Sequence, residues 1–154
     1  MNEQLPYFYE TEVEWTGARK GEMRSPGLPT LAVAAPPEFK GHAGIWTPEH
    51  LFVASVNLCF MTTFLAIAEM SKLEFVSFTC KGNGKLEKVE GKGFQMTEVV
   101  LSPKLTLRHS RDVERAHRIL EKTEANCLIS NSIKTVVKLE PEIRLAEMTE
   151  GVAA

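Results

Sequence analysis

The longest apolar segment of the chain runs from Leu51 to Ala68 and contains no charged residue. The residues Thr47, Pro48 and Glu49 come shortly before it. A threonine can cap a free helical N–H, a proline suits the first helical position, and a glutamate is favourable at the positive end of a helix. The pattern therefore predicts one long helix that begins near Thr47 and ends near Met70.

This apolar segment is also long enough to span a membrane. No asymmetry of lysine and arginine flanks it, and it is diluted by the polar residues Ser55, Asn57, Thr62 and Thr63. We therefore interpret it as a buried helix of a globular protein. A helix that is apolar on every side needs cover on every side, which a domain of this size can hardly supply alone. The sequence thus predicts a homodimer in which the second subunit covers part of the helix.

Alternating apolar and polar positions predict strands on both sides of the helix. The strands expected on this basis cover residues 7–15, 31–35, 75–81, 99–107 and 137–145. Gly17 and Gly21 bracket an expected turn. Gly82-Asn83-Gly84 has the composition of a hairpin turn, so a partner strand is expected after it.

Two further helices are expected in the C-terminal half of the chain. Ser110 can cap the first, which carries an apolar stripe of Val113, Ala116, Ile119 and Leu120. The second is short and runs from about Cys127 to Ile133. Strands interrupted by helices in this irregular order predict an α+β protein with a single domain over residues 1–154. The tail after Leu145 is expected to be loosely ordered.

The composition excludes several classes of partner. The chain has 154 residues, a net charge of −2 and a pI of about 6.1, and no basic cluster favours nucleic acid or a membrane surface. Three cysteines are too few for a disulfide scaffold, and the four histidines lack metal-ligand spacing. The first residues, MNEQLPYFYETEVEW, do not resemble a signal peptide. We therefore expect a cytoplasmic protein with reduced thiols and neither a metal nor a bound cofactor.

Cys59 and Cys127 have unlike surroundings in the sequence. Cys59 lies within the apolar helix, where a thiol is usually inert, whereas Cys127 lies at an expected helix start, where the pKa of a thiol falls. Two such thiols suggest an attacking and a resolving cysteine. Cys80 alternates with Val76 and Phe78 on an expected strand, so we expect it to pack in the core.

Three motifs resemble those of the OsmC/Ohr family of thiol-dependent hydroperoxide reductases. The segment TPEHLFVASVNLCF is similar to the family's NPEQLF…ACF signature, CLISNS to its CPYSN or CPxS motif, and WTGARKG to the GGRxG turn that carries its arginine. Their order and spacing agree over nearly the whole chain, and Glu49 and Cys59 keep the family's ten-residue separation. The resemblance implies an OsmC-like α+β fold, with antiparallel sheets, a long buried central helix and an intertwined homodimer.

The resemblance also implies roles for four residues. Cys59 corresponds to the peroxidatic thiol and Cys127 to the resolving thiol, while Arg19 corresponds to the activating arginine and Glu49 to its carboxylate partner. An arginine favours the ionised form of a buried thiol, and a carboxylate can hold that arginine in place. The implied activity is the reduction of organic hydroperoxides to alcohols, with a Cys59 sulfenic acid resolved as a disulfide. An external dithiol would regenerate the thiols, and a lipoylated protein is a candidate for it.

Two alternatives accompany this interpretation. Arg24 competes with Arg19 for the activating role. A non-enzymatic protein of the same fold, which binds an apolar ligand between subunits or acts as a redox switch, is the alternative function. Ten helical residues place Glu49 and Cys59 about 15 Å apart along the helix axis, so one arginine of the same chain would hardly touch both. We therefore expect the second subunit to complete the site.

The motifs also depart from the family pattern in places. Leu128 replaces the usual proline after the second cysteine, and Thr47 and His50 replace the common residues around the Pro-Glu pair. Asn57 and Leu58 replace the usual small residues before the first cysteine. The four candidate site residues are unaffected, but these changes bear on the preferred substrate and reductant.

Overall fold

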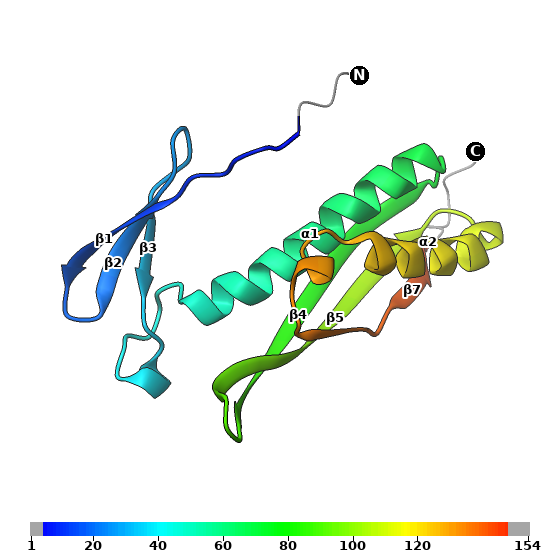
Figure 1. The fold of residues 1–154 in the computed structure, drawn as a ribbon. Helices are drawn as coiled ribbons and strands as arrows, with labels where there is room; N and C mark the ends of the chain where they lie inside the picture. Colours follow the sequence, from blue (N-terminus) through cyan, green and yellow to red (C-terminus); the bar gives the residue numbers. More distant parts are fainter. Residues whose placement is uncertain (1–4, 148–154) are drawn as a thin grey trace. The chain divides into compact units, whose positions relative to one another are not determined.

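A three-stranded antiparallel sheet is the main element of the first of two units, residues 1–51 (Figure 1). The second unit is residues 52–154, and the computed structural model describes residues 5–147 in all. The single domain expected over residues 1–154 stays a prediction.

The sheet of the first unit has the order β1-β2-β3, with β1 at Glu12–Gly17, β2 at Lys20–Arg24 and β3 at Leu31–Ala34. A turn that contains Ala18 and Arg19 joins the first two strands. Its backbone has positive φ at Gly17 (127°) and Ala18 (49°), and glycine adopts such angles freely. The predicted turn and the strand expected over residues 31–35 are confirmed. A short 3-10 helix, η1 at Pro37–Phe39, follows in the next loop.

The first strand is shorter and more exposed than its alternating pattern predicts. It begins at Glu12, so Tyr7 and Tyr9 precede it, and Trp15 is 75% exposed. Among the described residues β1 pairs with β2 alone and is an edge strand. An alternating pattern indicates a face that suits burial, but it does not say whether the same chain supplies the cover. A strand is therefore confirmed from Glu12 onward, whereas its expected start at Tyr7 and its half-burial are wrong for the single chain.

The long helix forms where the sequence predicts it, as α1 at Pro48–Met70. The hydroxyl of Thr47 accepts a hydrogen bond from the backbone N–H of His50 at 3.1 Å, which confirms the predicted N-cap. By length and composition α1 could cross a membrane, a property that it shares with the core helices of soluble proteins.

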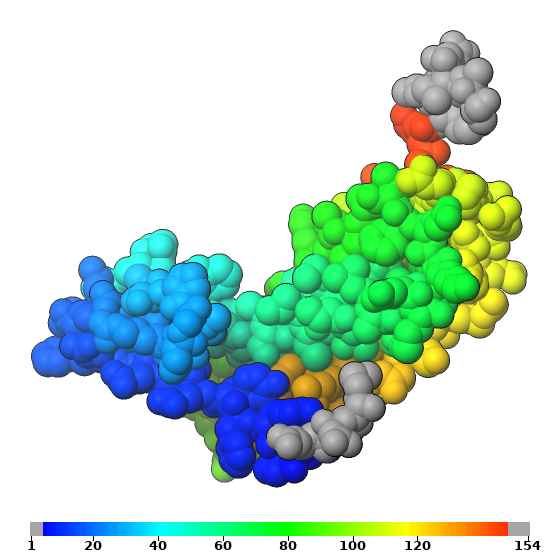
Figure 2. All heavy atoms as spheres, turned by 90° about the horizontal axis from the view of Figure 1, so that it is seen from above, coloured from blue at the N-terminus to red at the C-terminus, as the bar shows by residue number. Residues whose placement is uncertain are grey.

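Only one side of α1 is covered within the second unit. The side chains buried there are Val56, Phe60, Phe64, Ile67 and Ala68. Other large apolar side chains of the helix remain exposed, among them Leu58 (58%) and Leu65 (40%), and atoms of α1 lie open on the surface in Figure 2. The prediction of a buried helix therefore holds for one side of α1 in the single chain. The cover expected from a second subunit is not tested.

A four-stranded sheet packs against two helices in the second unit (Figure 1). Its strands are β4 (Phe75–Val89), β5 (Gly93–Leu107), β6 (Val136–Leu139) and β7 (Glu142–Leu145), and the second helix is α2 (Val113–Asn126). β4 runs antiparallel to β5, whereas β6 and β7 run parallel to successive parts of β5. Alternate residues of β5 are fully buried in one cluster with residues of α1 and α2: Val99, Leu101, Leu105 and Leu107. Both helices thus cover the same face of the sheet, and the α+β class is confirmed.

Gly82 and Gly84 lie within β4 and not in a hairpin turn. The strand continues through them to Val89, and the chain reverses at residues 90–92. A Cβ atom on Gly84 would lie 2.3 Å from Cγ2 of Val53, so the glycine lets α1 approach the strand closely. The turn predicted at Gly82-Asn83-Gly84 is wrong, because these glycines serve helix packing and not chain reversal.

The second helix begins slightly later than predicted. Ser110 opens a short 3-10 helix, η2 at Ser110–Asp112, and α2 follows without a side-chain cap. The predicted apolar stripe is confirmed, since Ala116, Ile119 and Leu120 are buried.

The segment after α2 also differs in detail from the prediction. The short helix expected from Cys127 is limited to a 3-10 helix, η3 at Ser130–Ser132. The last expected strand is divided into β6 and β7 around Pro141, which has no N–H for continued pairing. Most of the tail that was expected to be loosely ordered, residues 148–154, lies outside the described residues.

Candidate functional site

Cys59 lies on α1 and is partly exposed, between the fully buried Val56 and Phe60. The hydroxyl of Thr63 lies 3.9 Å from its sulfur, within reach of a hydrogen bond to sulfur. Residues four positions apart share one face of a helix, so α1 itself sets this contact.

Cys127 directly follows the last residue of α2 and is fully buried. Its backbone is extended (φ −68°, ψ 114°), and its N–H donates to the carbonyl oxygen of Glu124 at 3.3 Å. The chain then turns, and the N–H of Asn131 donates to the carbonyl oxygen of Cys127 at 3.0 Å. This turn directs the residues after Cys127 back toward α1.

The turn places Cys127 and Ile129 against Cys59. The backbone N–H of Ile129 donates to the sulfur of Cys59 at 3.5 Å, and Cys127 lies close enough to influence the pKa of Cys59. Both cysteines are reduced. The structure thus brings together the two cysteines that the sequence suggests as a pair.

The surroundings of Cys59 favour its thiolate. Burial acts to raise the pKa of Cys59, because a charged sulfur loses hydration. Hydrogen bonds outweigh this effect and hold the pKa of Cys59 below the value of an ordinary thiol. In order of effect, the donors are the N–H of Ile129, the thiol of Cys127, the hydroxyl of Thr63 and the N–H of Leu128.

The pKa of Cys127 is shifted in the opposite direction from that of Cys59. Burial raises the pKa of Cys127, and the hydrogen bond and charge of Cys59 raise it further, against an opposing effect of Ser130. The expectation that Cys127 is the thiol with the lowered pKa is therefore wrong. Cys127 follows the end of α2 and does not lie at a helix start. The backbone N–H groups of the next turn, at Leu128 and Ile129, lower the pKa of Cys59 instead.

Cys80 lies on β4 and packs against the core, as predicted. Burial raises its pKa to about 11, so the thiol stays protonated near neutral pH. The amide of Asn57 donates to the carbonyl oxygen of Cys80 at 2.9 Å, which ties α1 to the strand.

Arg19 lies in the first unit, in the turn between β1 and β2, and it is exposed. The turn is fixed by two hydrogen bonds. The indole N–H of Trp15 donates to the carbonyl oxygen of Ala18 at 2.8 Å, and the N–H of Ala35 donates to that of Arg19 at 3.1 Å. Within residues 5–147 the guanidinium of Arg19 makes neither an ion pair nor a hydrogen bond. A well-fixed turn therefore presents an uncommitted cation.

Arg24, the competing candidate, is committed to two carboxylates. Its Nη1 contacts Glu14 at 2.6 Å, and its Nη2 contacts Glu22. Glu14 and Glu22 are direct partners in the pairing of β1 with β2. This arrangement favours Arg19 over Arg24 for an activating role.

Glu49 lies in the first turn of α1. Among the residues that the structure describes, its buried Oε2 atom has no hydrogen-bond partner. An unsatisfied buried polar atom costs about 1–3 kcal/mol. We therefore expect a donor from outside the described chain to complete this carboxylate.

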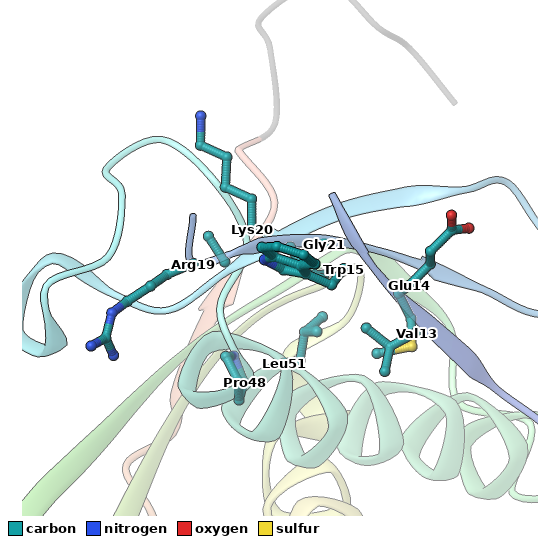
Figure 3. Close-up of a pocket in the computed structure, with 11 residues that line it drawn as sticks. Val13, Glu14, Trp15, Arg19, Lys20, Gly21, Pro48 and Leu51 are labelled. Atoms are coloured by element: carbon teal, nitrogen blue, oxygen red, sulfur yellow. The ribbon is translucent and has the colours of Figure 1, made fainter. Parts of the chain in front are cut away.

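A cavity of about 540 Å³ lies beside Arg19 within the first unit (Figure 3). Its walls are mostly apolar and include Val13, Trp15 and Leu51. Figure 3 shows the guanidinium of Arg19 reaching away from Trp15. The first unit therefore combines an apolar cavity with a positive charge.

Sequence reasoning missed the groups that touch the sulfur of Cys59. Ile129 and Leu128 act through backbone N–H groups, which have no signature in residue type. Thr63 could have been identified, because it lies one helical turn after Cys59.

Comparisons with known proteins identify the family of the chain. The model of the OsmC-like protein family matches residues 41–142. The chain is 28% identical over 141 residues to the uncharacterized protein YmaD of Bacillus subtilis (strain 168), and the match covers 88% of this chain and 92% of YmaD.

Solved structures of similar fold point the same way. An OsmC-like protein of unknown function from Vibrio cholerae has a TM-score of 0.81 and 23% identity, over 88% of this chain and 99% of that one. An organic hydroperoxide resistance protein OsmC from Legionella pneumophila has a TM-score of 0.71 and 25% identity, over 90% of this chain and 97% of that one. Since the family model covers more than half of the chain, including Glu49, Cys59 and Cys127, the chain belongs to the OsmC-like family.

Proposed function

We propose that this protein is a thiol-dependent peroxidase that reduces organic hydroperoxides to alcohols. The observation that carries the proposal is the contact between Cys59, whose pKa is lowered, and Cys127, whose pKa is raised. A lowered pKa increases the fraction of Cys59 that is thiolate at a given pH, and the thiolate is the reactive form of cysteine. This difference between the two thiols favours an enzyme over the alternative, a ligand-binding protein with passive cysteines.

In the first proposed step, the Cys59 thiolate attacks one oxygen of the hydroperoxide and the O–O bond breaks. Cys59 becomes a sulfenic acid, and the leaving alkoxide takes up a proton and departs as an alcohol. The partial exposure of Cys59 allows a substrate to approach, and the N–H of Ile129 stabilises the sulfur before the attack.

In the second proposed step, the sulfur of Cys127 attacks the sulfenic sulfur of Cys59, water leaves and a disulfide forms. Besides burial, the charge of Cys59 helps to raise the pKa of Cys127 in the reduced protein. A neutral sulfenic acid removes this repulsion. Oxidation of Cys59 therefore eases the ionisation of Cys127, which fits attack by one thiol followed by resolution by the other.

We further propose that a homodimer completes the site, with Arg19 as the activating cation and Glu49 as its partner. Among residues 5–147, neither the guanidinium of Arg19 nor the buried Oε2 of Glu49 has a partner, and this supports the pairing. The exposed apolar side chains of α1 support a second subunit that covers them. The apolar cavity beside Arg19 suits the organic part of a hydroperoxide better than it suits hydrogen peroxide.

The disulfide must then be reduced by two electrons from an external dithiol, and a lipoylated protein is the proposed donor. The Legionella pneumophila protein of similar fold is named for organic hydroperoxide resistance, which is the same class of substrate. The proposal requires no metal, bound cofactor, nucleic acid or membrane. A cytoplasmic location remains an expectation from the sequence.

Peroxide consumption by cysteine variants tests this function. We expect Cys59→Ser to abolish turnover of cumene hydroperoxide with a dithiol, because a hydroxyl does not ionise near neutral pH. Without a dithiol, Cys127→Ser should consume about one equivalent and remain a sulfenic acid that mass spectrometry detects after trapping. Cys80→Ser is the matched control and should keep full turnover. Undiminished turnover by Cys59→Ser would refute the proposal and leave the binding protein as the alternative.

A further inference from the structure

The turn of backbone that follows Cys127 lies against the sulfur of Cys59. The N–H of Ile129 donates to this sulfur at 3.5 Å, and Ile129 has helical backbone angles (φ −68°, ψ −44°). The hydrogen bond from the N–H of Asn131 to the carbonyl oxygen of Cys127 closes one helical turn. The first N–H groups of such a turn have no acceptor within it and point in one direction. The N–H of Leu128 therefore points to the same side as that of Ile129.

We propose that the peptide N–H of Leu128 acts together with that of Ile129 to stabilise the Cys59 thiolate, so that residue 128 sets the reactivity of Cys59 through its backbone and not its side chain. The consequence for catalysis rests on the proposed peroxidase function. The stabilisation of the anion can be measured without any peroxide.

The contacts of Leu128 support a role for its backbone. Its N–H donates to no backbone carbonyl among residues 5–147. Besides the N–H of Ile129, this N–H is the second backbone group that lowers the pKa of Cys59. The side chain of Leu128, in contrast, is 70% exposed.

Substitutions at position 128 separate the contribution of the backbone N–H from that of the leucine side chain. Proline has no N–H, so it cannot donate to the sulfur of Cys59. The backbone of Cys127 (φ −68°, ψ 114°) already has the extended angles that a residue before proline prefers. Leu128→Pro therefore removes the donor with no demand on Cys127 for a new conformation, while Leu128→Ala removes the side chain and keeps the donor.

The experiment is alkylation of the reduced full-length protein by iodoacetamide across a range of pH. Mass spectrometry of the cysteine peptides reports Cys59 separately, so all three cysteines stay native. We expect Leu128→Pro to raise the pKa of Cys59 by about one unit, as the loss of one hydrogen bond to a charged group does. At any pH below the pKa of Cys59 in the original protein, the alkylation rate of Cys59 in Leu128→Pro should be about tenfold lower than in the original protein. Leu128→Ala should keep the pKa of the original protein.

An unchanged pKa of Cys59 in Leu128→Pro, or an equal increase in both variants, would overturn the proposal. If the proline variant fails to fold, an ester at position 128, made with leucic acid, removes the same N–H without adding a ring and should give the same increase. A pKa that responds as expected in a protein that consumes no peroxide would leave this inference intact and reject the proposed function.

Discussion

The backbone N–H of Ile129 donates a hydrogen bond to the sulfur of Cys59 at 3.5 Å, although 70 positions separate the two residues. α1 holds Cys59, and the turn after α2 holds Ile129. Both helices pack into one core cluster, and Ile129 packs against it. The reactivity of Cys59 therefore depends on the fold of the second unit, because backbone groups offset the cost of burying a charged sulfur.

The three cysteines should differ in the pH at which they react with iodoacetamide. The thiolate is the reactive form, so each rate rises as the pH passes the pKa of that thiol. The rise in the alkylation rate of Cys59 should occur at a lower pH than that of an ordinary thiol, and the rise for Cys127 at a higher pH. Cys80 should react only near pH 11. Peptide-resolved mass spectrometry provides the measurement.

The variant Cys59→Ser is the control for the interaction between the two thiols. It removes the charge that opposes ionisation of Cys127. The rise in the alkylation rate of Cys127 should therefore shift toward lower pH in this variant. Alkylation of Cys127 before Cys59 in the original protein would contradict the assigned order of reaction.

Gly84→Ala should destabilise the protein by about 1–3 kcal/mol, as overpacking of a core contact does. The added Cβ would lie 2.3 Å from Cγ2 of Val53 on α1 and 2.7 Å from Cε of Met96. Urea unfolding measures the change in the free energy of unfolding. Gly82→Ala should cost less, since its nearest neighbour is 3.2 Å away.

A double variant tests the cause of this effect. Val53→Ala removes the atom that meets the new Cβ, so the combination with Gly84→Ala should cost less than the sum of the two single changes. Strict additivity would show that close packing of α1 on β4 is not the reason for glycine at position 84.

The long helix and the apolar stripe of α2 could be predicted because each depends on local signals. Thr47 caps α1 as its residue type suggests, and Ile119 and Leu120 recur at helical spacing. The turn at Gly82 and Gly84 was mispredicted because the same residue type serves chain reversal and close packing, and only the position of Val53 distinguishes them.

In the candidate site, too, features that depend on residue type could be predicted, and features that depend on tertiary position could not. The pairing of Cys59 with Cys127 could be inferred from motifs, because it depends on residue type. The direction of each pKa shift could not, because it depends on where the backbone donors of Ile129 and Leu128 lie. Tyr7 and Trp15 show a further limit, since they are exposed and an alternating pattern does not tell whether the same chain covers its apolar face.

The protein should be a dimer in solution. Light scattering should report about twice the chain mass of 17.2 kDa. Leu65→Glu, on the exposed part of α1, should weaken the dimer, because it places a charge in an apolar contact. His117→Glu adds the same charge to the exposed surface of α2 and is the matched control. A folded monomer of the original protein at micromolar concentration would contradict the proposed cover of α1.

If the proposed dimer brings Arg19 to Cys59, Arg19→Ala should raise the pKa of Cys59 by about one to two units, because a cation beside a thiolate stabilises it. Arg19→Lys should restore only part of the loss, since lysine lacks the planar fork of arginine. The measurement is the pH dependence of Cys59 alkylation, combined with the rate of peroxide consumption at one pH. The hydrogen bond from Ile129 remains in both variants, so some stabilisation of the thiolate should persist.

Arg24→Ala is the matched control for Arg19→Ala. It releases Glu14 and Glu22 from exposed ion pairs, which contribute little to stability, and it should leave the pKa of Cys59 unchanged. The two arginines are five positions apart in the same hairpin, so a general loss of that hairpin would affect both variants alike. A pKa of Cys59 that responds to Arg24→Ala and not to Arg19→Ala would assign the activating role to Arg24.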